Sequence, residues 1–496
     1  MRSRTLVACG LVALVVALAA RADEEKPQQA QSLFTGLVYN NGSDGVTVYF
    51  VMHGSPADVA GIETGSVIET VDTKPVPDAK GLHAYLLTAK VGQTIALGVK
   101  TRAGEKKVLS IVMSPRDNAA LIKTALRDGA RVLAEKAAPS GAGWTRHQGP
   151  QTPDDLGSGL SALACRALAE LPAELREPHL KLIDRTLETL RKRAEGTYWV
   201  TDENSLAGQS YETHATAETI LALVARRGAN DPDVAYLASG LAARQLGARN
   251  GGPFSGWFTD LDWQSGGFPF EDRAIVRRTD IRVTLAAEVI ALEALHAAGF
   301  GKDHPTMVLA RRYLARVQNL DDEPDPLLKD LVDGGFPESG IMSKAGPKDV
   351  GERRIQRSYG SATTDGLAAL IYSGSDEKRI AAAKDWIRNH FELSKTPGFV
   401  PDPANPRARN PFEQGIRFYY VASLARALDL CGETPFATSQ GTRAWPVELL
   451  NTLLYDQRRD GAWKNFTPVM DEDNEIIATS EALLALEKVY GPIVGR

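Results

Sequence analysis

Carboxylic acids in polar stretches are the residues of this chain whose types and spacing suggest chemistry. The stretch TDLDWQ places Asp260 and Asp262 two positions apart, and Glu212, Asp280 and Glu413 lie in similar stretches beside arginine, tyrosine or histidine. A carboxyl group shielded from water keeps its proton and can donate it, whereas a solvated one is ionised and accepts a proton. These five residues are therefore the candidates for acid or base catalysis, although none belongs to a complete catalytic set.

The charge and length of the chain limit what these acids can serve. The chain has 496 residues, a net charge of -5, 43% hydrophobic residues and 24% charged residues. These values are ordinary for a globular protein of more than one domain. Nucleic acids and anionic membranes attract dense basic surfaces, which this chain does not supply, so we expect no nucleic-acid partner.

The N-terminus has the three parts of an export signal. Arg2 and Arg4 precede an apolar stretch over 6–20, and Ala20-Arg21-Ala22 fits an A-x-A cleavage site. We predict a signal peptide over 1–22, cleaved after Ala22, a linker over 23–31, and an exported protein, periplasmic or extracellular. An uncleaved anchor is the alternative, although a bilayer span needs about 20 apolar residues. No later segment is apolar enough, so we expect no stable membrane span after cleavage.

Residues 32–114 are predicted to form a β-rich domain. Short runs such as GVTVYFVM and TIALGVKT are rich in Val, Ile and Thr and are bounded by Gly, Pro, Asp and Asn. One helix is expected over 78–89 because Leu82, Tyr85 and Leu86 follow helical spacing.

The sequence motif of this region resembles that of a bacterial PDZ domain. The run GSPADVAGIETGSVIETVDTKPV, residues 54–76, carries the resemblance, with Ser66 and Thr73 departing from the usual Asp and Gly. The resemblance implies that Phe34, Thr35, Gly36 and Leu37 form a carboxylate-binding loop. It also implies that an extended peptide or a protein C-terminus adds as a strand in a groove beside Leu82, Tyr85 and Leu86. Core packing is the alternative role for Phe34 and Leu37.

Residues 115–496 are predicted to be helical and repetitive. A large ring follows a glycine or a short turn at intervals of 55 to 69 residues, and each ring follows one helix and precedes another. We expect Ala-rich inner helices over 154–171, 212–227, 282–298, 360–373, 412–430 and 475–490. More charged outer helices are expected over 118–136, 175–194, 232–247, 305–319, 377–393 and 445–458. The repeated rings, expected to fill the seams between helix pairs, are Trp144, Trp199, Phe268, Phe336, Phe399 and Trp463.

Six helix pairs favour a closed (α/α)6 toroid, with an open superhelix as the alternative. The stretch QRRDGAW, with Gln457, Gly461 and Trp463, resembles the Q-x-x-x-G-x-W repeat of squalene and oxidosqualene cyclases, and weaker forms occur in protein prenyltransferase β-subunits. The fold class predicted for the whole chain is therefore a PDZ domain followed by an all-α toroid.

The activities of those families need residues that this chain lacks. A cyclase uses a D-x-D-D motif. Here Asp260, Leu261 and Asp262 match its first three positions, but Trp263 occupies the fourth position in place of Asp. A prenyltransferase binds zinc through Asp, Cys and a later His; Asp429 and Cys431 are present, but no His follows His390. We expect no metal and no cofactor. Cys165 and Cys431 are expected to be buried thiols, with a disulfide between them left open.

The inner helices suggest a polar site at one mouth of the toroid. Glu218, Glu288, Asp365 and Glu481 align at one position of these helices, either lining a cavity or supporting the helix starts. Other polar residues expected at the mouth are Asp202, Glu212, His214, Arg278, Asp280, Arg282, Glu413, Arg417 and Tyr419.

The leading hypothesis is an exported, non-enzymatic protein that binds peptides through its PDZ domain and carries the toroid as a scaffold or ligand-binding cavity. The alternative is a glycoside hydrolase or lyase that acts on a polar polymer at the toroid mouth through Glu212, Asp280 or Glu413. An isoprenoid cyclase using Asp260 or Asp262 is the third hypothesis.

Overall fold

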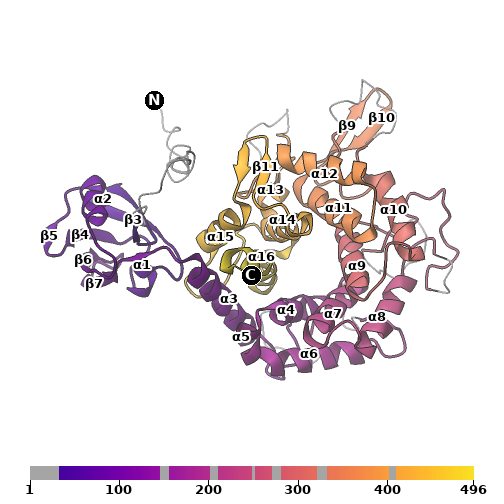
Figure 1. The fold of residues 1–496 in the computed structure, drawn as a ribbon, viewed down its shortest axis with the longest axis horizontal. Helices are drawn as coiled ribbons and strands as arrows, with labels where there is room; N and C mark the ends of the chain where they lie inside the picture. Colours follow the sequence, from indigo (N-terminus) through magenta and orange to yellow (C-terminus); the bar gives the residue numbers. More distant parts are fainter. Residues whose placement is uncertain are drawn as a thin grey trace.

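The computed structural model describes residues 33–145, 156–201, 211–248, 252–270, 281–320, 332–401 and 409–495. The predicted signal and linker, and Asp202, Arg278 and Asp280, lie outside these residues. Two domains, each with its own hydrophobic core, are joined through one long helix, α3 (Asn118–Glu135) (Figure 1).

The N-terminal domain is an antiparallel sheet with one helix packed against it. Its strands run in the order β2-β3-β4-β6-β7, which leaves β2 at an edge, and β5 pairs with β4. Val46, Val48, Ile68 and Leu97 are fully buried at alternating positions of these strands, as expected when one face of a sheet covers a core. The elements are β1 (Leu33–Phe34), β2 (Leu37–Gly42), β3 (Gly45–Val51), α1 (Pro56–Val59), β4 (Val67–Val71), β5 (Lys74–Pro75), α2 (Ala79–Leu87), β6 (Thr94–Lys100), β7 (Lys106–Val112) and β8 (Ser114–Pro115).

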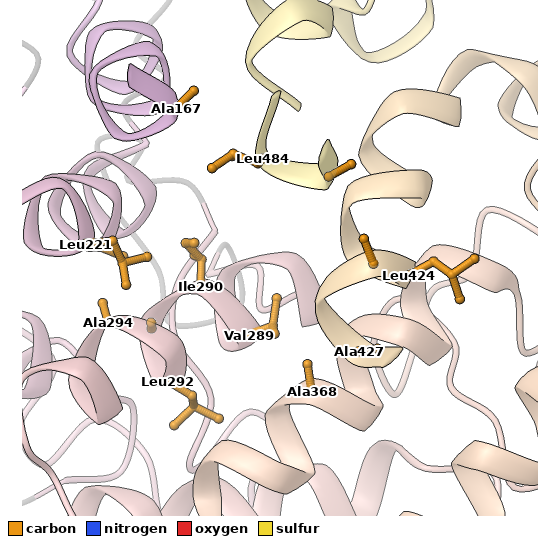
Figure 2. Close-up of a cluster of buried hydrophobic side chains, with 14 of the residues drawn as sticks. Ala167, Leu221, Val289, Ile290, Leu292, Ala294, Ala368, Leu424, Ala427 and Leu484 are labelled. Carbon is orange, nitrogen blue, oxygen red and sulfur yellow. The ribbon is translucent and has the colours of Figure 1, made fainter. Parts of the chain in front are cut away.

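The C-terminal domain is a closed ring of helix pairs, as the repeat predicted. Within the described residues, the inner helices are α4 (Ser158–Glu170), α7 (Glu212–Arg227), α9 (Leu285–Ala297), α11 (Gly360–Ser373), α14 (Arg417–Cys431) and α16 (Glu475–Val494). Each inner helix packs against the next, and α16 packs against α4, so the ring closes and the open superhelix is excluded. Figure 2 shows buried side chains contributed by each of these helices: Ala167, Leu221, Ile290, Ala368, Leu424 and Leu484.

The outer helices bury a single face and leave the other in water. For example, α6 (Leu180–Lys192) buries Ile183, Leu187 and Leu190, which follow helical spacing, and exposes its charged residues. The inner helix α9 is instead buried almost all round. The other outer helices are α8 (Pro232–Ala243), α10 (Pro305–Val317), α12 (Glu377–Asn389) and α15 (Trp445–Asp456), with α3 completing the layer.

The structure differs from the sequence prediction in three places. Two hairpins interrupt the helical domain, β9 (Pro347–Val350) with β10 (Arg353–Gln356), and β11 (Phe436–Thr438) with β12 (Gly441–Arg443). The helix predicted over 412–430 is broken at Ile416 into α13 (Pro411–Gly415) and α14, because the Glu472 carboxylate caps the start of α14 by accepting from the amides of Phe418 and Tyr419. Helix α16 continues past its predicted end to Val494. Short elements complete the fold: α5 (Ala173–Arg176), η1 (Glu177–His179) and η4 (Val469–Asp471).

No helix in the described parts of the chain combines the length and the apolar character that a bilayer span requires.

Candidate functional site

The first candidate site is the open edge of β2 beside α2. Strand β2 pairs with β3 along one edge, and no described strand covers the other edge. Helix α2 packs against β2, and Leu37 and Tyr39 are half-buried between the strand and the domain core. Leu82 and Leu86 of α2 are buried in the domain core, beside Leu37 and Tyr39. An unpaired strand edge beside a helix is the geometry that accepts an extended peptide as an added strand.

A glycine turn precedes β2. Gly36 has φ +77°, and a Cβ placed on it would lie 2.1 Å from the Cβ of Ser55, so only glycine fits. The Gly36 N–H makes no hydrogen bond within the described residues, while the Leu37 N–H donates weakly to the Thr35 hydroxyl at 3.3 Å. A backbone donor without a partner at such a turn suits a carboxylate.

The second candidate site is a cavity of about 1110 Å³ enclosed by the helical ring. Its mouth lies at the N-terminal ends of the inner helices, and its floor lies about midway along them. The ring is therefore not plugged by side chains, as a pure scaffold would be. Rings and apolar groups line its wall, including Tyr211, Phe270, Tyr359, Phe412, Tyr419, Leu163, Val289, Ile290, Ile477 and Leu484.

The floor of the cavity is a buried ionic network. The Arg166 guanidinium, which is almost fully buried, donates to Glu170 at 2.6 Å, Glu218 at 3.2 Å and Glu293 at 2.7 Å. Burial alone would raise the pKa of Glu293, but Arg166 and Arg426 outweigh burial and lower it to about 2. Burying charged groups costs free energy of desolvation. In this network, the attraction between each arginine and its several carboxylate partners offsets that cost.

Arg426 extends the network across the ring to α11. It donates to Glu293 at 3.1 Å and to Asp365 at 2.8 Å. Asp365 also accepts from the Tyr419 hydroxyl at 2.7 Å and the Ser423 hydroxyl at 2.5 Å. Burial nevertheless raises the pKa of Asp365, because desolvation outweighs the attraction of Arg426. The cavity wall and its charged floor are thus one connected structure.

Glu481 and His214 are two titratable groups of the cavity that lack such partners among the described residues. Glu481 makes no hydrogen bond with any described residue, and burial together with Glu218 and Glu472 raises its pKa to about 8. Burial lowers the pKa of His214 to about 4, and its Nδ1 has no described partner. At neutral pH the cavity therefore holds a mostly protonated acid and an uncharged imidazole.

Residues 28–113 match the family model of the PDZ domain. The N-terminal domain is a PDZ domain. No curated protein matches the chain. Among solved structures, a variant of the type II terpene cyclase MstE from Scytonema is 16% identical, with a TM-score of 0.46, covering 76% of this chain and 99% of its own. A family 76 glycoside hydrolase from a bovine Bacteroides thetaiotaomicron strain is 12% identical, with a TM-score of 0.42, covering 79% and 84%. The toroid assignment rests on the helix contacts themselves.

The PDZ domain is docked on the outside of the toroid. His53 lies between Asp58 of the PDZ domain, at 3.3 Å, and Asp128 of α3, at 2.8 Å. Burial lowers the pKa of His53, but the two carboxylates outweigh it and raise it to about 9. Arg459 pairs with Glu63 at 2.8 Å across the same interface.

The predicted carboxylate-binding loop lies at this interface. Phe34 packs against the toroid core, and the Arg116 guanidinium lies 5.0 Å from the centre of its ring. Arg116 is held by Asn118 and Asn451. Phe34 therefore contacts the toroid. Tyr85 is half-buried, and its hydroxyl donates to Asp72 at 2.6 Å.

The acids proposed for catalysis do not line the cavity. Glu212 pairs with Arg244 at 2.8 Å, and Glu413 pairs with Lys395 at 2.5 Å. Asp260 is exposed and 3.7 Å from Arg312, while Asp262 accepts from Thr259 in a surface turn. Asp280 lies outside the described residues. Of the other residues expected at the mouth, His214, Arg282 and Tyr419 line the cavity.

The predicted ring of acids needs one correction. The loop amides of Phe268, Phe336 and Trp463 donate to Glu288, Thr363 and Thr479, so Glu288 matches the threonine position and lies outside the cavity wall. The position two residues later faces the cavity and holds Glu218, Ile290, Asp365 and Glu481. The sequence alignment placed Glu288 wrongly because its carboxylate accepts the loop amide that a threonine hydroxyl accepts in the other inner helices.

A repeated glutamine is the feature that the sequence reading missed. Gln457 donates to the Gly461 carbonyl and to Ala125 of α3, the outer helix of the first pair, so this contact closes the ring. Gln245 likewise donates to Gly266 and Thr306, and Gln318 donates to Gly334 and Arg379. In each case the glycine has positive φ. It also packs against the next outer helix, at the residue three positions after the one whose carbonyl the glutamine bonds there: Asp128, Leu309 and Ala382. The signal was hidden because 21 and 16 residues separate Gln245 and Gln318 from their glycines.

The repeated rings occupy their seams unequally. Trp144, Phe268, Phe336 and Trp463 are fully buried. In the second repeat the buried residue is Val200, whose amide donates to Thr216, and Trp199 is half-buried beside Arg244. Phe399 is half-buried against Tyr359. Cys165 and Cys431 are both free thiols.

Proposed function

We propose that this chain is an exported protein that captures extended peptides or protein C-termini in its PDZ groove and binds a second ligand in the toroid cavity. The observation that carries the proposal is the unpaired edge of β2, which lies beside α2 and follows a glycine turn whose Gly36 amide has no partner among the described residues. Backbone hydrogen bonds along such an edge give affinity, and the side-chain pockets give selectivity. The open cavity supports the role of the toroid as a ligand-binding domain.

The test is peptide binding by the full chain, with a C-terminal peptide library followed by pairs of peptides that differ only in a free or amidated C-terminus. Because the turn offers amides to a carboxylate, we expect amidation to weaken binding at least about tenfold, the loss of one charge-assisted hydrogen bond or more. Equal binding of both forms, or binding of neither, contradicts the proposal.

A matched pair of glycine variants tests the turn itself. Gly36→Ala forces a Cβ onto Ser55 and should weaken peptide binding by a similar factor. Gly104→Ala introduces the same positive-φ strain in the β6–β7 turn, where nothing lies within 4 Å, and should leave binding unchanged. Thermal melting of both variants separates a folding defect from a binding defect.

Hydrolysis of a polar polymer is the second candidate function, supported by the acids Glu218 and Glu481 in one cavity with raised pKa values. A pair of carboxyl groups, one of them protonated, is what glycoside hydrolysis requires. Release of reducing ends from polysaccharides that is absent in Glu481→Gln supports this function.

A further inference from the structure

The floor of the toroid cavity contains more acids than bases. Among the described residues, Arg166, Arg426 and Lys488 face the carboxyl groups of Glu170, Glu218, Glu293, Asp365 and Glu481. Arg166 and Arg426 already donate to four of these acids, and Lys488 lies 3.5 Å from Glu170. If every one of these groups were ionised, they would carry two negative charges in excess, and the buried carboxyl group of Glu487 beside Lys488 and Arg166 would add a third.

Glu481 is the acid on the cavity surface that this network leaves without a base. A second acid, Glu487, is buried outside the cavity lining with neither carboxylate oxygen hydrogen-bonded, and burial raises its pKa well above the ordinary value. Glu481 lines the cavity from α16, and the part of it that remains exposed faces the cavity. The charged groups around it are Glu218 on α7, Glu472 before α16, Arg426 on α14 and Arg166 on α4. The two bases are engaged by other carboxylates, so Glu481 stays protonated unless a positive charge arrives.

The wall above Glu481 contains groups that suit a cation with an apolar body. Three further cationic residues, Arg282, Lys344 and Lys464, also line the cavity, and Lys344 pairs with Glu338 at 2.6 Å. The rings of Tyr211, Phe270, Tyr359, Phe412 and Tyr419 line the cavity together with leucine, valine and isoleucine side chains. The face of an aromatic ring attracts a positive charge, most strongly where water is excluded. An anion would gain no ion pair from Glu481, and a neutral molecule would leave Glu481 protonated, whereas a cation favours its ionised form.

We propose that the toroid cavity binds an organic cation, a primary ammonium or guanidinium group on an apolar chain, whose charge pairs with Glu481 and Glu218. The inference rests on the proposed role of the toroid as a ligand-binding domain and is independent of the PDZ groove. A metal ion is disfavoured because no group of three His, Cys, Asp or Glu in the described part of the chain is arranged to hold one. Binding transfers the Glu481 proton to solvent, so the complex holds an ammonium–carboxylate pair.

The test is calorimetric titration of the full chain with hexylammonium, hexan-1-ol and hexanoate, which share one chain length and differ in charge. Hexylammonium should bind at least about tenfold more tightly than the other two, a factor equivalent to one well-placed ion pair. Its binding enthalpy should change with the ionisation enthalpy of the buffer, because a proton is released. Equal binding of all three compounds, or no binding of hexylammonium, overturns the inference.

Glu481→Gln provides the second readout, because the amide keeps the shape but cannot ionise. Since the pKa of Glu481 is about 8, hexylammonium affinity should rise about tenfold for each pH unit up to pH 8 and then level off. In Glu481→Gln that rise and the proton release should disappear, while Glu135→Gln, an exposed acid on α3, should behave as wild type. An unchanged pH profile in Glu481→Gln overturns the inference.

Peptide binding measured on the same samples separates the two proposals. If the protein binds peptide but does not bind hexylammonium, only the proposed cation site is overturned. Hexylammonium binding without peptide binding supports the cation site and overturns the PDZ role.

Discussion

The two domains offer their binding surfaces in opposite ways. The PDZ domain exposes the backbone of an edge strand, so its site is completed only when another chain pairs with β2. The toroid has no such edge between its inner helices, because α16 packs back on α4, and its site is an enclosed space lined by side chains. The first site reads an extended backbone, whereas the second reads the charge and shape of a small group.

The hydrophobic cores of the two domains also differ in size and in the charged groups that they enclose. The PDZ core is a small apolar cluster between a sheet and one helix. The toroid core is continuous through all the inner helices and encloses charged groups such as Arg166. Mutations should therefore affect the two domains separately, except at their interface.

The largest effect is expected from removing the ring that closes the toroid. Trp463 is fully buried, and its indole donates to the Leu453 carbonyl at 2.8 Å. Trp463→Ala should lower the free energy of unfolding of the toroid by about 4 kcal/mol, because a large cavity remains and the indole hydrogen bond to Leu453 is lost. All seven tryptophans lie after residue 143, so tryptophan fluorescence during denaturation reports the toroid alone.

Trp257→Ala is the control for this prediction, because Trp257 is 38% exposed. Its cost should be below about 1 kcal/mol. If Trp463→Ala cost no more than the control, the seam would not hold the ring closed.

A smaller loss is expected from breaking the ionic floor. Arg166→Met leaves three buried carboxylates with one base fewer and should cost the toroid about 3 kcal/mol near neutral pH. The cost should shrink in mild acid, because the acids released from Arg166 become protonated there. Lys192→Met removes an exposed i,i+4 pair with Glu188 and should leave stability almost unchanged, because solvent screens the two charges. Urea denaturation at several pH values checks both variants.

The smallest of these effects should occur at the contact between the domains. Burial lowers the pKa of His53, but Asp128 across the interface and Asp58 within the PDZ domain raise it from its ordinary 6.5 to about 9. The part of this rise that comes from Asp128 depends on docking, so the contribution of His53 to docking is largest at low pH and is lost as the pH rises through 9. His53→Gln should remove about 2 kcal/mol of docking at pH 6 and almost nothing at pH 10. Hydrogen exchange at the start of α3 measures the docking, and a pH-independent effect would contradict the assigned role of His53.

The PDZ fold and the helical ring were both predictable because their signals are local. The alternation of apolar residues in 45–51 and the sequence motif that begins at Gly54 depend only on neighbouring residues. The Ala-rich helices repeat at a nearly constant interval along the chain. The cavity residues were less predictable. Glu218 and Asp365 were found from the repeat, but Glu288 was misplaced, and the partners that occupy Glu212 and Glu413 come from other elements.

The sequence alone determined the strands of the PDZ domain, most helices of the toroid, and the recurrence of a glycine and a large ring between helices, since periodicity and turn chemistry act over a few residues. It did not indicate the hairpins β9–β10 and β11–β12 or the break at Ile416. Only the tertiary structure decided which acids share a base, since Arg166 meets Glu293 from 127 positions away. It also decided which acid is left in the cavity without a partner. Desolvation and pairing depend on every neighbour in space, and chain order does not record those neighbours.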